Sequence, residues 1–131
     1  MRPVIEKELI ERELQDYLIL EGSQTNPYPY IKQATLYVQP SYYEAYSTTV
    51  TEAKILAKPI VVTDVGGMRD QLEDTVNGMI VPISADGIAN AVFLLMASPE
   101  IMDQFSRKLS RERFECEYYL KDYNRTVFGE A

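Results

Sequence analysis

Short, uniformly apolar segments alternate along this chain with segments of helical periodicity, and this alternation constrains the fold more than any other feature. The apolar runs, with PIVVT as the clearest, stand at residues 17–22, 36–40, 59–63 and 77–82. Apolar residues at helical spacing occupy 2–15, 48–57, 85–97 and the stretch from 98 to about Tyr123. A brief helix is also expected at 68–74, after the break at Gly66-Gly67. Strands that are apolar throughout are buried on both faces, as in a parallel sheet between two helical layers. We therefore predict an α/β fold, a three-layer α/β/α domain with a mostly parallel sheet of about four to five strands.

Composition limits both the size of the domain and its chemistry. The 131 residues, 46% of them apolar, suit one domain with a real core. A net charge of −7 repels a phosphate backbone, so we expect no nucleic-acid partner. Since the chain has no histidine and Cys116 is its single cysteine, Ser-His-Asp and Cys-His catalysis, His/Cys zinc sites and internal disulfides are excluded.

The ends of the chain and its hydropathy lead to two further expectations. No apolar run approaches the roughly 20 residues of a membrane-spanning helix, and no signal segment is apparent, so we expect a cytoplasmic protein. The chain opens on a helical segment, whereas a doubly wound unit usually begins with a strand. We therefore expect residues 1–131 to form a single domain that is a fragment of a longer protein and lacks its own first strand.

Two loops that follow expected strands carry the candidate site, because ligands of open parallel sheets bind beyond the carboxyl ends of the strands. The first loop, 40–49, holds Glu44 and leads into a helix with Glu52; the second, 63–67, holds Gly66-Gly67. The start of a helix suits a phosphate, and a carboxylate on each side accepts hydrogen bonds from hydroxyls. A sugar nucleotide, with phosphates between two hydroxylated ends, fits this pattern.

Each of these signals also has a simpler structural explanation, and the residues alone leave both open. Thr49-x-x-Glu52 matches a capping box, in which Glu52 binds the N–H of its own N-cap. Glu44 alone is a solvated loop carboxylate, and Gly66-Gly67 alone is a turn that needs positive φ. The loop tyrosines would then be packing residues: Tyr42, Tyr43 and Tyr46.

Taken together, the motifs of residues 40–82 form an ordered set. Its members are Pro40-Ser41, Glu44, Glu52-Ala53, Lys58-Pro59-Ile60, Asp64 to Gly67 and Asn77-Gly78. The set resembles the C-terminal domain of the group 1 retaining glycosyltransferases, enzymes of the GT-B fold, and the resemblance extends over roughly 14–110. It implies a Rossmann-like domain that forms the donor-binding C-terminal half of such an enzyme. The acceptor site would lie on an N-terminal domain absent from this chain.

The resemblance also implies roles for individual residues. Glu44 would be the catalytic carboxylate, contacting hydroxyls of the donor sugar and supporting its electron-poor ring, and Glu52 would accept from the ribose hydroxyls. The residues between them, whose backbone amides would meet the diphosphate and sugar, are Ala45, Tyr46, Ser47, Thr48 and Thr49. The loop residues Ser23 and Gln24 would lie near the base, and Gly66 and Gly67 would line the same crevice.

The implied reaction is transfer of a sugar, with retention, from a UDP- or GDP-sugar to a saccharide or lipid-linked acceptor. By resemblance to bacterial members we expect a role in surface polysaccharide synthesis, in the cytoplasm or peripherally at the inner face of the membrane. No Asp-x-Asp motif is present, and we expect neither a metal nor another cofactor.

Three positions depart from the family pattern. Ala45 and Ser47 stand where glycine is frequent, and Ala57 stands where a glycine usually ends the helix, so a left-handed cap would be strained. The cations nearest the expected phosphate site are few: Lys54, Lys58 and Arg69. We therefore predict that this chain alone is inactive and binds nucleotide weakly.

Other functions remain as alternatives. A nucleotide-sugar epimerase of the same fold usually needs histidine, and a receiver or flavodoxin-like module needs an N-terminal strand with acidic or phosphate-binding loops. A degenerate, non-catalytic binding domain is the third alternative, with Ala45 as its best support. The aromatic tail would be either ordinary core or a helix that crosses to the other domain: Phe114, Tyr118, Tyr119, Tyr123 and Phe128.

Overall fold

The computed structural model describes residues 1–129, and for 114–120, 122–124 and 127–128 it describes the backbone only. The elements in chain order are α1 (Arg2–Glu11), α2 (Tyr28–Gln33), β1 (Tyr37–Gln39), α3 (Thr48–Ile55), β2 (Ile60–Thr63), the 3₁₀ helix η1 (Gly66–Met68), β3 (Met79–Val81), α4 (Ala85–Ala97) and α5 (Pro99–Phe128). The expected helix over 85–97 agrees to the residue, and the helix expected from 98 runs on without a break to Phe128.

The three strands form one parallel sheet in the order β1-β2-β3. In the centre, Val61 of β2 pairs with Val38 of β1 on one side and with Met79 of β3 on the other. All four residues of β2 are buried, as its β-branched, apolar composition predicts for a strand covered on both faces. The predicted α/β class with a parallel sheet is confirmed, although the described residues form three strands rather than four or five.

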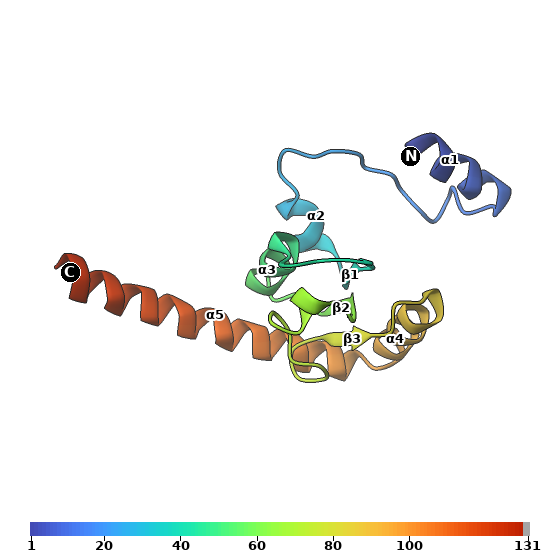
Figure 1. Ribbon diagram of the computed structural model, residues 1–131. Coiled ribbons are helices and arrows are strands. Elements are labelled where there is room, and N and C mark those ends of the chain that lie inside the picture. The colour runs from blue at the N-terminus through green and yellow to red at the C-terminus, as the bar shows by residue number, and fades with distance from the viewer. Residues whose placement is uncertain (130–131) are drawn as a thin grey trace.

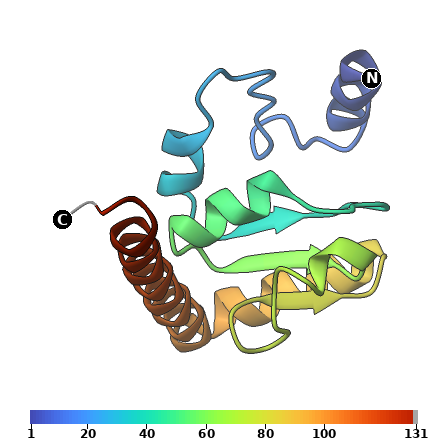
Figure 2. The same ribbon diagram turned by 60° about the vertical axis from the view of Figure 1, so that its left-hand side comes forward.

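Helices cover both faces of this sheet, which gives the three layers expected (Figures 1 and 2). Because successive side chains of a strand point to opposite faces, Ile60 and Val62 pack into one cluster and Val61 into another. The first cluster includes residues of α2, α3 and η1, and the second includes Ala91 and Leu95 of α4. Helix α5 contributes to both clusters and then projects from the body (Figure 1).

The outer part of α5 carries the aromatic tail. The expectations for Phe114, Tyr118, Tyr119, Tyr123 and Phe128 concern side chains that lie outside the described ones. Within the described part of the chain, we find no helix whose length and hydropathy would let it cross a bilayer.

The strand expected at 17–22 was wrong. These residues belong to a long connection between α1 and α2, away from the sheet (Figure 1), and Ile19 is 77% exposed. An apolar run forms a buried strand only where it can pair with a neighbouring strand and pack under a covering layer. At this position the described residues provide neither.

The brief helix expected at 68–74 was also wrong. The chain forms η1 and then turns. Here the side chain of Asn77 accepts a hydrogen bond from the N–H of Glu73 at 2.8 Å, and Asp74 accepts from Ile80 N at 2.8 Å. Side-chain acceptors of this kind compete with helical bonding, and Thr75 takes a left-handed φ of 63°.

Candidate functional site

The two candidate loops meet beyond the carboxyl ends of β1 and β2. The N–H of Gly67 donates to the backbone oxygen of Glu44 at 3.0 Å, and the Thr63 hydroxyl donates to the backbone oxygen of Ser41. A Cβ on Gly67 would overlap the backbone of Ala45 and Glu44, whereas one on Gly66 would meet open space. Neither glycine has positive φ, so the interpretation of this pair as a left-handed turn was wrong. Gly67 is required because two backbones approach closely.

Glu44 is held by the fold at the mouth formed by these loops. Gln39, the last residue of β1, donates from Nε2 to Glu44 Oε2 at 3.1 Å, and Glu44 is only partly exposed. Its description as a freely solvated loop carboxylate was therefore wrong. The strand end fixes one carboxylate oxygen.

Glu52, on α3, has one satisfied and one unsatisfied oxygen. Tyr28 donates its hydroxyl to Oε1 at 3.4 Å, whereas Oε2 is buried and has no hydrogen-bond partner among the described residues. The capping-box interpretation was wrong, because the N-cap is Ser47, whose hydroxyl accepts from Val50 N. A buried acceptor without a donor costs stability, so this oxygen marks a place where a ligand donor is favoured.

The electrostatics of Tyr37 show that both carboxylates belong to one neighbourhood. Burial is the main cause that raises the pKa of its hydroxyl above the ordinary 10.0; a hydrogen bond with Thr49 acts in the opposite direction. The charges of Glu52 and Glu44 each raise that pKa further. Two like charges acting on a single half-buried hydroxyl fit a pair that flanks the mouth.

The start of α3 is assembled from Ser47 and two glutamines. The Ser47 N–H donates to Gln71 Oε1 at 2.8 Å, and its hydroxyl donates to Gln39 Oε1 at 2.9 Å. The N–H and the hydroxyl proton of Ser47 are thus used inside the fold. Ala45, Tyr46 and Thr48 are exposed beside it.

The exposed tyrosines lie on the same loop. Tyr42, Tyr43 and Tyr46 are 87%, 85% and 60% exposed, so they do not serve as packing residues within the described chain. By contrast, Ser23 and Gln24 lie on the connection before α2, where Gln24 donates to Glu21 O at 2.8 Å, and no hydrogen bond joins either of the two to Glu44 or Glu52 among the described residues.

Sequence reasoning missed Tyr28, Gln39 and Gln71, which contact the site residues directly. Gln39 carried a signal that could have been used, because it ends an apolar strand. Gln71 stands among charged residues, with Arg69 and Asp70 before it and Glu73 after Leu72, and only the structure shows that it is buried. A buried side-chain amide must find hydrogen-bond partners, and here these partners belong to the loop at residues 40–49.

Two of the three candidate cations are already paired. Arg69 binds both oxygens of Asp64, at 2.8 and 2.6 Å, and these bonds raise the pKa of its guanidinium. Lys54 donates to the backbone oxygen of Gln71 at 2.6 Å and lies 3.8 Å from Glu112. Among the described residues no group of His, Cys, Asp and Glu could hold a metal ion.

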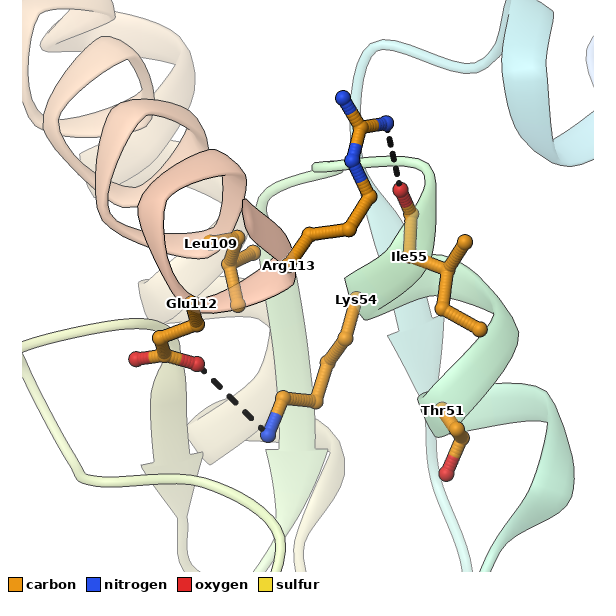
Figure 3. A pocket seen from close by; sticks show the side chains of 6 residues that line it. All are labelled: Thr51, Lys54, Ile55, Leu109, Glu112 and Arg113. Carbon is orange, nitrogen blue, oxygen red and sulfur yellow. Dashed lines mark hydrogen bonds and ion pairs between the residues drawn. The ribbon is translucent and has the colours of Figure 1, made fainter. Parts of the chain in front are cut away.

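A pocket of about 190 Å³ lies between α3 and α5 (Figure 3). Its polar side chains are engaged with the protein: Lys54 faces Glu112, and Arg113 donates to the backbone oxygen of Ile55 at 3.2 Å. These contacts hold α5 against α3. The start of α3 carries the residues of the candidate site.

Comparison with known proteins gives one consistent result. The family model described as "Glycosyl transferases group 1" matches residues 2–111. An alpha-D-kanosaminyltransferase of Streptomyces kanamyceticus is 30% identical over 108 residues, which is 80% of this chain and 28% of that protein.

Solved structures agree. The sucrose-phosphate synthase of Thermosynechococcus elongatus superposes with a TM-score of 0.78 and 26% identity, over 99% of this chain and 35% of that one. Anabaena HepE in complex with UDP-glucose superposes with a TM-score of 0.79 at 17% identity, over 86% of this chain and 32% of that one. This chain therefore spans about a third of the length of the proteins that it matches.

Proposed function

The chain belongs to the group 1 glycosyl transferases, and from that premise we propose that it supplies the donor site of an enzyme that uses a nucleotide sugar. The enzyme would move a hexose, with retention, from a UDP- or GDP-sugar to a saccharide or lipid-linked acceptor. The observation that carries this proposal is the buried, unpartnered Oε2 of Glu52, in the same neighbourhood as Glu44. The UDP-glucose in the structurally similar HepE supports the choice of ligand class.

Each part of the mouth then has a task. Glu52 accepts hydrogen bonds from the ribose hydroxyls, which gives its buried oxygen the donors it lacks among the described residues. Glu44 holds hydroxyls of the transferred sugar and stabilises positive charge that develops on the ring, without acting as a nucleophile. The first N–H groups of α3, those of Thr48 and Thr49, face the diphosphate, because the start of a helix stabilises the charge of a leaving phosphate. Ala45, Tyr46 and Gly66 line the path between them.

The remaining parts of the enzyme would be supplied by polypeptide outside this chain, including the acceptor domain and cations for the diphosphate. Arg69 and Lys54 are engaged with Asp64 and Glu112. Each missing charge-assisted hydrogen bond costs about 1.5–3 kcal/mol, and every 1.4 kcal/mol is roughly tenfold in affinity. We therefore expect this chain alone to be inactive and to bind UDP or GDP no more tightly than millimolar. Sub-millimolar binding by calorimetry would contradict this part of the proposal.

We place the enzyme in the synthesis of bacterial surface polysaccharide, at the cytoplasmic side or the inner face of the membrane. The sequence resemblance to bacterial members supports this assignment. The decisive experiment is a transfer assay in the longer enzyme that joins this chain to its acceptor domain.

In that assay, Glu44→Gln should abolish transfer, because a neutral amide no longer supports the charged ring. Glu52→Ala should raise the donor KM and change kcat less, because it removes ribose binding. The matched control is Glu100→Gln, on the exposed first turn of α5. Wild-type kinetics in both site variants would refute the assignment.

A further inference from the structure

We propose that Gln39 and Gln71 are positioning residues that hold the loop at residues 40–49, which we call the mouth loop, from its two sides. Gln39 holds the side of Glu44, where the proposed function places the sugar, and Gln71 holds the start of α3, where it places the diphosphate. The inference rests on the proposed function and deepens it, because it separates which part of the donor each half of the loop serves. We call the two side chains the glutamine clamp.

Gln71 binds the start of α3 through both ends of its amide. Its Oε1 accepts from the N–H of Ser47 at 2.8 Å, and its Nε2 donates to the backbone oxygen of the same residue at 2.8 Å. Nε2 also lies 3.1 Å from Thr51 Oγ1. Gln71 is 5% exposed and Ser47 3%, so water cannot replace these bonds. This pairing fixes where the first free N–H groups of α3 point.

The backbone of Gln71 is fixed in turn. Lys54 Nζ donates to its carbonyl oxygen at 2.6 Å, and Lys54 belongs to the same helix α3 whose first residues the Gln71 side chain holds. The loop after η1 and helix α3 are therefore joined at two points, one near the start of the helix and one near its end. The start of α3 cannot shift relative to the second loop without breaking several buried hydrogen bonds.

Gln39 holds the other side of the loop. Its Nε2 donates to Glu44 Oε2 at 3.1 Å and to Ser41 Oγ at 3.2 Å. Its Oε1 accepts from Tyr37 Oη at 2.7 Å and from Ser47 Oγ at 2.9 Å. The carboxylate that the proposed function assigns to the sugar is thus oriented by the last residue of a strand.

A side-chain amide is suited to both tasks. Each glutamine donates and accepts at once, whereas a carboxylate only accepts and an apolar side chain of similar length does neither. Replacing either glutamine by methionine keeps length and flexibility while removing every one of these bonds. The two replacements should therefore produce different defects in ligand recognition.

The test titrates the 131-residue chain with uridine, UDP and UDP-glucose, followed by two-dimensional NMR. Gln71→Met should lower the ratio of UDP affinity to uridine affinity about tenfold, the effect of losing one well-placed bond to phosphate. It should leave uridine affinity within twofold. Gln39→Met removes the acceptor of the Ser47 hydroxyl but leaves the Ser47 N–H and carbonyl oxygen bonded to Gln71, so it should lower the UDP-to-uridine ratio less than Gln71→Met does, and it should change the UDP-glucose-to-UDP ratio by at least threefold. Gln104→Met, on the exposed side of α5, is the matched control and should change neither ratio.

A general loss of packing would lower all three affinities together, so the ratios separate positioning from simple destabilisation. If Gln71→Met fails to fold by circular dichroism, Gln71→Glu decides instead. It keeps the acceptor for Ser47 N–H but loses the donor, and it should lower the UDP-to-uridine ratio while uridine still binds. Unchanged ratios in folded variants that bind ligand as wild type would overturn the clamp alone. Nucleotide-induced shifts of the wild-type chain that are centred away from the mouth would overturn the proposed function itself.

Discussion

The mouth of the sheet and the N-terminal 25 residues both expose large hydrophobic side chains, yet they are held in opposite ways. At the mouth, exposed tyrosines stand on a loop whose backbone is fastened by buried amides from Gln39 and Gln71. In the N-terminal region, Leu9 is the single buried apolar residue, and Arg2 donates a side-chain hydrogen bond to the backbone oxygen of Leu20 at 3.3 Å.

Exposed apolar side chains therefore do not by themselves show that the backbone of a segment is weakly held. What separates the two regions is where backbone and side-chain polar groups find their partners. The mouth is organised before any ligand arrives, as the proposed donor site would require. The predictions below challenge that contrast, beginning with the largest effect.

Burial in the core should give the largest difference in stability between the sheet that carries the mouth and the N-terminal region. Ile60→Ala, in fully buried β2, should lower the free energy of unfolding by about 2–5 kcal/mol, because it leaves a cavity. Ile19→Ala, at 77% exposure, should change it by less than about 0.5 kcal/mol. Urea denaturation followed by circular dichroism measures both. A loss of more than 1.5 kcal/mol for Ile19→Ala would mean that the N-terminal run is buried after all.

The close approach of the two loops should be nearly as sensitive. Gly67→Ala should lower stability by about 1–3 kcal/mol, because its Cβ would overlap the backbone of Ala45. Gly66→Ala is the control, and since its Cβ meets open space it should stay within about 0.5 kcal/mol of wild type. Equal unfolding midpoints in urea for the two variants would show that the loops do not touch.

The end of α3 offers a change that stabilises. Ala57 has a φ of 52°, the strain expected from its place before Lys58-Pro59, and Ala57→Gly should raise the free energy of unfolding by about 1 kcal/mol. Ala45 also stands where the family often has glycine, but it has no positive φ. Ala45→Gly should therefore give no gain. Thermal denaturation of the two variants tests this, and an equal gain from both would contradict the backbone assignment.

Tyr37 gives the smallest effect, a dependence on alkaline pH. Burial raises the pKa of its hydroxyl above 10.0, so the neutral form is favoured in the folded state. The stability that this preference for the neutral hydroxyl adds to the folded state is fully present below pH 10 and is lost as pH rises through the folded-state pKa. Between pH 9 and pH 11, wild type should therefore lose more stability than Tyr37→Phe, by under about 1 kcal/mol because the ring is half-buried. Urea unfolding at the two pH values measures this, with Tyr43→Phe as the exposed control; a larger loss in Tyr37→Phe would reverse the sign.

The elements that could be predicted from the sequence are those that local periodicity and turn chemistry determine. The buried strand expected at 59–63 and the helix at 85–97 follow from local patterns, and the strain at Ala57 follows from the family resemblance. The apolar run at 17–22 misled, because burial depends on neighbours that a linear pattern does not contain. The helix expected at 68–74 did not form: Asn77, which lies outside the segment, accepts the N–H of Glu73, and Asp74 accepts the N–H of Ile80.

The candidate site was predictable as a set of residues and less so as an arrangement. Spacing indicated Glu44 and Glu52, but only the fold shows that Ser47, and not Thr49, caps α3. The clamp residues lie 5 positions before Glu44 and 24 after Ser47. Contacts at such separations follow from topology, which no local motif encodes.

The most direct test of the central claim is a UDP-glucose titration of the isolated chain, monitored by amide shifts. The account predicts weak, saturable shifts confined to residues 41–52 and 63–71, reduced at least fivefold in affinity by Glu52→Ala and unchanged by Glu100→Ala; this factor corresponds to about 1 kcal/mol for the lost bonds. Shifts centred elsewhere, or equal affinities for wild type and Glu52→Ala, would contradict it.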